Sequence, residues 1–128
     1  MQALLLVALG GALGSVARYL VGMITLRSLG PGWPYGTFTV NALGGFAIGA
    51  LAAWLAFRGA ASQERLRLLL QVGVLGGFTT FSAYSLDIAV MIERRAWTQA
   101  VAYGLSSVFT SLAAVFLGLI VVRKLVAA

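Results

Sequence analysis

The sequence predicts an all-α membrane protein with four transmembrane helices, and three observations support this fold class. Hydrophobic residues make up 61% of the 128 residues, whereas charged residues make up only 9%. Soluble domains carry roughly 25% charged residues, so a soluble fold of this composition could not cover itself with polar surface. Four segments are apolar enough to cross a bilayer, which takes about 20 residues each. Only short connections separate these segments.

The four apolar segments follow one another along the whole chain, which we interpret as one transmembrane domain of 128 residues. The first runs from about residue 3 to 26 and is interrupted by Arg18, and the second runs from about 37 to 57. The third runs from about 66 to 92 and the fourth from about 98 to 122. The N-terminus lacks the basic residues of a secretory signal, so we expect it to be retained as the first helix. Strands are disfavoured because open sheet edges cannot face lipid.

The third segment contains a polar interruption, GGFTTFSAYS, at residues 76–85. Gly76 and Gly77 lack side chains and tolerate non-helical dihedral angles. The threonines and serines of this stretch offer local hydrogen bonds that compete with the helical ladder. We therefore expect the third helix to be broken near Gly76–Thr80, which would free backbone carbonyls inside the membrane. Such irregular backbone is tolerated only where it is buried in protein or lines a cavity, and freed carbonyls can coordinate a cation.

The basic residues give a weak orientation signal. Four crossings place both termini on one side, which then carries five basic residues, and the other side carries three. The five are Arg58, Arg65, Arg67, Arg123 and Lys124, and the three are Arg27, Arg94 and Arg95. Loop lysines and arginines normally set the orientation of a membrane protein. So small a bias would let the chain insert either way; the alternative is a fixed orientation with both termini in the cytoplasm.

The composition also excludes several classes of function. The net charge of +6 does not indicate nucleic-acid binding because, apart from Arg18, the basic residues flank apolar segments. The chain has no Cys and no His, hence no disulfide, no Cys-based metal site and no imidazole for proton transfer. Asp87 is the only acid near the membrane interior, so paired-carboxylate catalysis lacks its second member. The sequence therefore predicts that the protein is not an enzyme.

Glycines at a four-residue spacing predict close helix packing. Gly10, Gly14 and Gly22 follow this spacing in the first segment, and Gly45 and Gly49 follow it in the second. Residues four apart lie on one face of a helix. Small residues on such a face let two membrane helices approach closely. The pattern predicts a compact bundle and does not identify a cargo.

Polar residues within the spans are candidates for a pathway, which we expect in an oligomer because one small chain has little internal room. Asn41 offers two donors and an acceptor, although an interhelical hydrogen bond is an alternative role. Tyr103, Ser107 and Ser111 recur every four residues and form one hydroxyl stripe along the fourth helix. Arg18 lies inside the first span, where a charge usually faces a cavity, although its side chain could instead snorkel to the interface.

Aromatic residues at a three-residue spacing accompany the predicted break. Phe78, Phe81 and Tyr84 fall on roughly one side of the third helix. The edge of an aromatic ring is positive. Ring edges turned inward would suit an anion, and simple core packing is the alternative.

Three stretches resemble the signatures of the Fluc (CrcB) family of fluoride channels. They are GGALGSVARY in the first helix, GTFTVNALGGF in the second and GGFTTFSAYSLD in the third, and the resemblance covers almost the whole chain. The resemblance implies a passive channel that is selective for fluoride and exports it from the cytoplasm, which gives resistance to fluoride toxicity. It also implies an inner-membrane, dual-topology homodimer, in which two antiparallel subunits form two pores.

The resemblance also implies roles for individual residues. The residues that match the fluoride pore are Asn41, Phe81, Tyr84, Tyr103, Ser107 and Ser111. Tyr84 stands where the family usually has phenylalanine, so its hydroxyl could donate to fluoride or could reposition the ring. Arg18 matches the family's first-helix arginine and would face the vestibule. A structural Na⁺ at the dimer interface would be bound by the backbone carbonyls of Gly76 and Thr79.

Two other functions are compatible with a short four-helix membrane chain. A small multidrug transporter of dual topology would resemble a chain with an essential glutamate in the first helix, but the first segment here contains no acid. A structural or assembly subunit would have no need for a hydroxyl stripe or a broken third helix. We therefore keep the transporter as the alternative to the fluoride channel.

Overall fold

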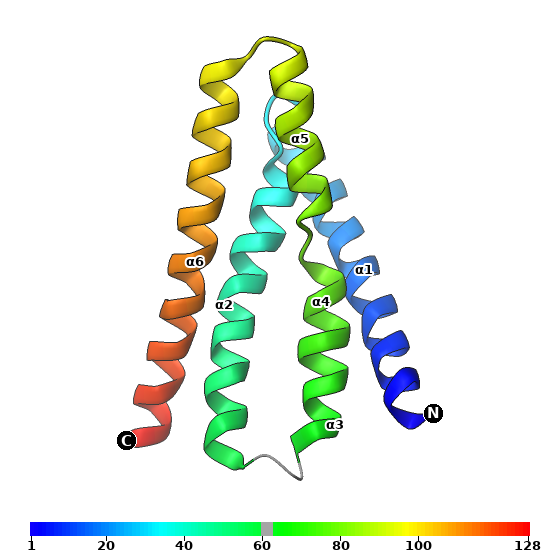
Figure 1. Cartoon of the computed structure of the whole chain (residues 1–128), viewed down its shortest axis with the longest axis vertical. Helices are drawn as coiled ribbons and strands as arrows, with labels where there is room; N and C mark the ends of the chain where they lie inside the picture. Colours follow the sequence, from blue (N-terminus) through cyan, green and yellow to red (C-terminus); the bar gives the residue numbers. More distant parts are fainter. Residues whose placement is uncertain (60–62) are drawn as a thin grey trace.

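Four helices long and apolar enough to cross a membrane make up the described part of the chain, residues 1–59 and 63–128. In this computed structural model, three of the spans are the unbroken helices α1 (Gln2–Leu29), α2 (Tyr35–Arg58) and α6 (Trp97–Ala127) (Figure 1). Every regular element in that part is helical. The prediction of an all-helical protein with four membrane-spanning helices is confirmed, and each span extends a few residues beyond its predicted limits.

The third span consists of four helical pieces. α3 (Glu64–Leu66), η2 (Arg67–Leu75) and α4 (Gly76–Phe78) follow one another without interruption, and η2 is a π-helix. The chain then leaves the helical conformation over Thr79–Phe81 before α5 (Ser82–Glu93) completes the crossing. The third span is therefore broken, as the sequence predicts.

The break lies at the C-terminal end of the predicted interval, Gly76–Thr80, and its two glycines are helical. Gly76 has a φ of −62° and a ψ of −38°, which are ordinary helical values. A Cβ atom at Gly77 would come within 2.6 Å of the Gly11 carbonyl oxygen in α1. The expectation that these glycines interrupt the helix is wrong, because at Gly77 the missing side chain serves close packing.

Glycines with positive φ end the first two spans. α1 ends at Leu29 because Gly30 adopts a φ of 82°, and its N–H donates a hydrogen bond of 3.0 Å to the carbonyl of Leu26. Pro31 follows and cannot continue a helix. Gly59 has a φ of 88° directly after α2. Both positions need a backbone conformation that side chains disfavour.

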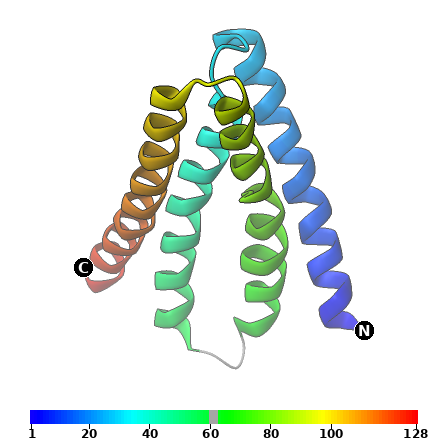
Figure 2. The same cartoon turned by 45° about the horizontal axis from the view of Figure 1, so that its top comes forward.

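The four spans form two packed pairs. α2 lies along α6, and α1 lies along the first part of the third span (Figures 1 and 2). Both termini lie at the same end of the bundle, and the connections after α1 and after α5 lie at the opposite end (Figure 1). The spans converge toward those connections and spread apart toward the termini (Figure 2). This arrangement keeps the mid-span break beside α2.

Small residues make both helix pairs possible. A Cβ atom added at Gly10 or Gly14 of α1 would collide with the backbone of Leu69 or Val74 in the third span. The predicted packing role of these glycines is confirmed. At Gly22 an added Cβ atom would meet nothing within 4 Å, so the packing stripe of α1 does not include this residue.

Glycines also allow close packing between α2 and α6. A Cβ atom at Gly45 would lie 2.7 Å from the carbonyl oxygen of Ser111, and one at Gly49 would collide with the carbonyl of Val115. The predicted packing role of Gly45 and Gly49 is therefore also confirmed. Close approach at Gly45 brings α2 directly against the part of α6 that carries the predicted hydroxyl stripe.

Two neighbouring glycines of α1 allow a matched test of this packing. We expect Gly14→Ala to lower the free energy of unfolding by about 1–3 kcal/mol, because the new methyl group overpacks the contact with Val74. Gly11→Ala adds the same methyl group where nothing lies within 4 Å, and we expect no loss of stability. Thermal unfolding of both variants in detergent measures the difference. Equal stability of the two variants would contradict this account of the packing.

Candidate functional site

The break in the third span has its own hydrogen bonds at both ends. Thr79 is extended, with a φ of −86° and a ψ of 158°. Its N–H and its hydroxyl both donate to the Leu75 carbonyl, at 3.0 and 2.9 Å, and so close the preceding helix. The Thr80 hydroxyl oxygen accepts the N–H of Ala83 at 3.1 Å, which caps the first turn of α5. The break is therefore a defined backbone conformation.

Asn41 of α2 binds the break from the side. Its Nδ2 donates to the Thr80 carbonyl at 2.9 Å, and its Oδ1 accepts the Thr80 N–H at 2.8 Å. In a continuous α-helix the Thr80 N–H would bond to the carbonyl of Gly76, four residues earlier. Asn41 therefore takes the place of one backbone hydrogen bond. Of the two predicted roles for Asn41, the structure contains the interhelical hydrogen bond.

Because the Thr80 N–H pairs with Asn41, the Gly76 carbonyl loses its helical partner, and the Thr79 carbonyl beside the break is available as well. Within the described residues, no hydrogen bond reaches the carbonyl oxygen of Gly76 or of Thr79. The same part of the chain contains no group of three or more His, Cys, Asp or Glu side chains able to hold a metal ion. The carbonyl oxygens of Gly76 and Thr79 are therefore able to accept a further partner.

A groove of about 410 Å³ extends from the break along α2 and α6. Apolar side chains such as Ile48, Val108 and Leu112 form much of its wall. It brings together five of the six residues predicted to line the pore. These are Asn41, Phe81, Tyr84, Ser107 and Ser111. Thr79 and Thr80 also border the groove, so it begins at the break.

The hydroxyl groups of α6 differ in their surroundings. Ser107 is only 4% exposed, and its Oγ forms no hydrogen bond within the described residues. The Ser107 hydroxyl interacts with the Tyr103 hydroxyl group, and Ser107 also borders the groove. Ser111 is half-buried on the same face. Ser106 and Thr110, which neighbour the stripe in sequence, are exposed and do not border the groove.

Two tyrosines near the groove are already hydrogen-bonded. Tyr103 is fully buried, and its hydroxyl donates to Oδ2 of Asp87 at 2.9 Å. It is the one predicted pore residue absent from the groove lining. The Tyr84 hydroxyl donates to the carbonyl of Gly104 at 2.8 Å. The two ring centroids lie 5.5 Å apart, and Tyr103 also packs against Trp33, which borders a separate space.

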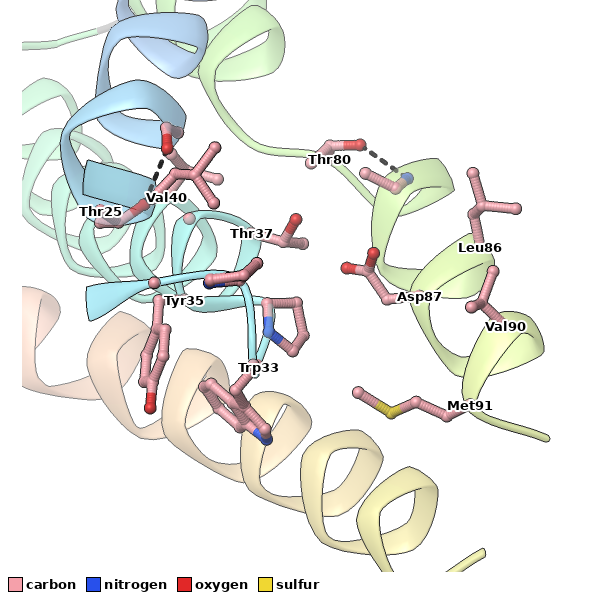
Figure 3. Close-up of a pocket in the computed structure, with 18 of the residues that line it drawn as sticks. Thr25, Trp33, Tyr35, Thr37, Val40, Thr80, Leu86, Asp87, Val90 and Met91 are labelled. Carbon is pink, nitrogen blue, oxygen red and sulfur yellow. Dashed lines mark hydrogen bonds between the residues drawn. The ribbon is translucent and has the colours of Figure 1, made fainter. Parts of the chain in front are cut away.

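That space is a second cavity, of about 610 Å³, at the end of the bundle away from the termini. Arg18 and Arg94 border it, and Asp87 and Thr37 point toward one another across it (Figure 3). Thr80 borders both the cavity and the groove. Arg18 therefore faces a cavity, one of the two positions that the sequence allows for it.

Asp87 was not predicted to belong to the site, and Thr80 was predicted only as the last residue of the broken backbone. Thr80 joins the groove to the cavity, and Asp87 receives the Tyr103 hydroxyl. Asp87 follows Tyr84 by three residues, so both lie on one face of α5. An acid on the same helical face as a candidate pore residue is a signal that could have placed Asp87 at the site.

Four helices long and apolar enough to span a membrane, with a mid-span break and a partly polar groove, define a multi-pass membrane protein. The chain belongs to the CrcB family, because a family model described as CrcB-like protein, Camphor Resistance (CrcB), matches residues 5–119. The resemblance read from the three sequence motifs is confirmed.

Named relatives share almost the full length of this chain. It is 65% identical over 127 residues to the fluoride-specific ion channel FluC of Phenylobacterium zucineum (strain HLK1), covering 99% of this chain and 100% of that one. With the same coverage, it is 61% identical to FluC of Caulobacter vibrioides (strain NA1000 / CB15N) and 46% identical to FluC of Hyphomonas neptunium (strain ATCC 15444). Ion channels are not enzymes, which agrees with the prediction from composition.

The Asn41–Thr80 pair allows a direct test of how the break is held. Leucine is close to asparagine in size and forms no hydrogen bonds, so Asn41→Leu leaves the Thr80 N–H and carbonyl unpaired. We expect the free energy of unfolding to fall by about 1–3 kcal/mol for each unpaired group. Amide hydrogen exchange should accelerate in a peptide covering residues 76–85.

A matched control removes an amide hydrogen bond far from the break. Gln99 donates to the Gly32 carbonyl at 3.2 Å on the exposed end of the bundle. Gln99→Leu should change the free energy of unfolding by less than about 0.5 kcal/mol and leave exchange at residues 76–85 unchanged. Unchanged exchange in Asn41→Leu would show that the break does not depend on this pair.

Proposed function

We propose that this chain is a fluoride-selective passive ion channel that lets cytoplasmic fluoride leave the cell and thereby gives resistance to fluoride toxicity. The observation that carries the proposal is the groove, which combines Asn41, Ser107 and Ser111 with aromatic rings between apolar walls. The names of the relatives, which are fluoride-specific ion channels, point to the same ion.

The chemistry of the groove suits fluoride. Fluoride is small and strongly hydrated, so a filter must replace its water with several donors in succession. Within the described residues the Ser107 Oγ forms no hydrogen bond, and the Asn41 amide has a second N–H beside the one that binds Thr80. Phe81 and Tyr84, whose ring centroids lie 5.6 Å apart, would add the positive edges of their rings.

The second cavity would serve as the vestibule of this path. Arg18 and Arg94 border it, and cationic side chains in a cleft raise the local concentration of anions. Tyr103 borders neither the vestibule nor the groove, and its hydroxyl donates to Asp87, which borders the vestibule. To donate to fluoride, this hydroxyl would have to release Asp87, so we place Tyr103 at the boundary of the pore.

The channel would be a dual-topology homodimer in the inner membrane. Phe81 is 77% exposed at the rim of the groove, an unusual position for a ring that is to line a pore. A second, antiparallel copy would cover the groove and bury this ring. The bias of five basic residues against three is weak enough to allow both orientations. Two copies would give two equivalent pores.

A structural Na⁺ at the dimer interface fits the residues at the break. Asn41 draws the Thr80 N–H away from Gly76, and the carbonyls of Gly76 and Thr79 accept no hydrogen bond within the described residues. Oxygen-only sites suit hard cations rather than soft metals. A bound Na⁺ would supply positive charge to carbonyl dipoles that would otherwise lie unpaired in the membrane, and would join the two subunits.

The multidrug-transporter alternative has less support. α1 carries neither Asp nor Glu, so the acid on which that mechanism depends is missing. The fluoride channel therefore remains the function that the geometry supports best.

Purified protein in liposomes should release fluoride and retain chloride, as measured with ion-selective electrodes. Phe81→Ile removes a ring edge worth about 1 kcal/mol, so we expect fluoride flux to fall by about fivefold. Because the Phe81 side chain is exposed within a single chain, the fold of that chain should survive the change. Phe109→Ile, at a ring of α6 that is 66% exposed and outside the groove, should leave the flux unchanged. Equal release of chloride by the wild type would refute the selectivity, and equal flux in both variants would place the path elsewhere.

The dimer proposal gives a separate expectation. A tag on the C-terminus should be accessible from both sides of the membrane, so about half of it should react in intact cells and all of it after permeabilisation. Purification with N-methylglucamine in place of Na⁺ should weaken the dimer in size-exclusion chromatography. A tag found on one side only would exclude dual topology, and a dimer indifferent to Na⁺ would exclude the structural cation.

A further inference from the structure

Two tyrosine hydroxyls connect α5 and α6 in opposite directions. Tyr84 of α5 donates to the Gly104 carbonyl of α6 at 2.8 Å, and Tyr103 of α6 donates to Asp87 of α5 at 2.9 Å. On α5 the donor, Tyr84, lies one turn before the acceptor, Asp87. On α6 the donor, Tyr103, lies directly before the acceptor, Gly104. This reciprocal pair joins the second half of the third span to α6 just beyond the break.

The first of these bonds determines which part of Tyr84 faces the groove. Tyr84 borders the groove, whereas Gly104 does not. The hydroxyl is therefore turned toward the backbone of α6, and the ring itself borders the groove. A tyrosine hydroxyl has a single hydrogen to donate, and here that hydrogen is used by Gly104.

The backbone at Gly104 leaves room for this bond. A Cβ atom added there would lie 3.5 Å from the Tyr84 hydroxyl and 3.3 Å from Cδ1 of Ile88. Any side chain longer than a methyl group would therefore compete with the hydroxyl for the same space. A carbonyl oxygen has two lone pairs, so Gly104 can accept the Tyr84 hydrogen in addition to its helical hydrogen bond.

We propose that Tyr84 is a positioning residue: its hydroxyl, held by the Gly104 carbonyl, fixes the ring so that the ring edge and not the hydroxyl borders the ion path. Phenylalanine at this position could not form such a bond. The proposal rests on the proposed function only in treating the groove as the ion path, because the bond itself can be tested without ion transport.

The sequence allows the carbonyl carbon of Gly104 to be observed by NMR beside only one other glycine carbonyl. Gly–Leu peptide bonds occur only at residues 104–105 and 118–119. Protein labelled with ¹³C-carbonyl glycine and ¹⁵N-leucine therefore gives two signals in an HNCO spectrum, and Gly118 serves as the internal reference. We expect Tyr84→Phe to move the Gly104 carbonyl signal upfield and to leave the Gly118 signal in place. Tyr19→Phe, at a ring that is 67% exposed on α1, should move neither.

Replacing chloride by fluoride in the wild-type sample tests the opposite role for the hydroxyl. If the hydroxyl stays on Gly104, the Gly104 signal will not respond to fluoride. The flux through Tyr84→Phe should then fall by no more than about threefold, the factor that corresponds to about 0.6 kcal/mol for one hydrogen bond between membrane helices. A Gly104 signal that moves with fluoride, or that is unchanged in Tyr84→Phe, would overturn the proposal. Absence of fluoride flux in the wild type would reject the channel while leaving the carbonyl measurement valid.

Discussion

The two hydrogen bonds between Asn41 and Thr80 are the interaction on which the rest of the site depends. A break inside a membrane exposes backbone groups that lipid cannot satisfy. Asn41 forms hydrogen bonds with both backbone polar groups of Thr80 and so lowers the free-energy cost of a non-helical stretch at mid-span. Three features of the site follow from this break. Within the described residues, the carbonyls of Gly76 and Thr79 accept no hydrogen bond, Phe81 is exposed, and α5 begins at Ser82.

Close helix packing brings Asn41 to the break. α2 can lie against α6 because Gly45 and Gly49 have no side chains, and Gly44 on the same turn admits the side chain of Thr79. A larger residue at any of these three positions would move α2 away and would separate Asn41 from Thr80. The glycines that seemed in the sequence to concern packing alone are therefore a condition for the polar site as well.

The sequence predicted the four spans because length and hydrophobicity decide them, with no reference to other parts of the chain. It located the break only approximately. The flexibility of glycine favoured an interruption at Gly76–Gly77, but contact with Gly11 holds Gly77 in the helix, and Asn41 draws the backbone away at Thr80. The hydroxyl direction of Tyr103 was also unpredictable, because its acceptor, Asp87, comes from a different helix.

The hydrogen bonds already formed around the groove limit the donors that could bind an anion. The Tyr84 hydroxyl is used by Gly104, the Tyr103 hydroxyl by Asp87, and one N–H of Asn41 by Thr80. Within the described residues, the Ser107 Oγ forms no hydrogen bond, and the second N–H of Asn41 is also available. Few strong donors are therefore available at any one point, and ring edges must contribute between them. An anion too large to reach the recessed Ser107 hydroxyl would lose this donor, whereas a small ion would meet the donors and the ring edges in succession.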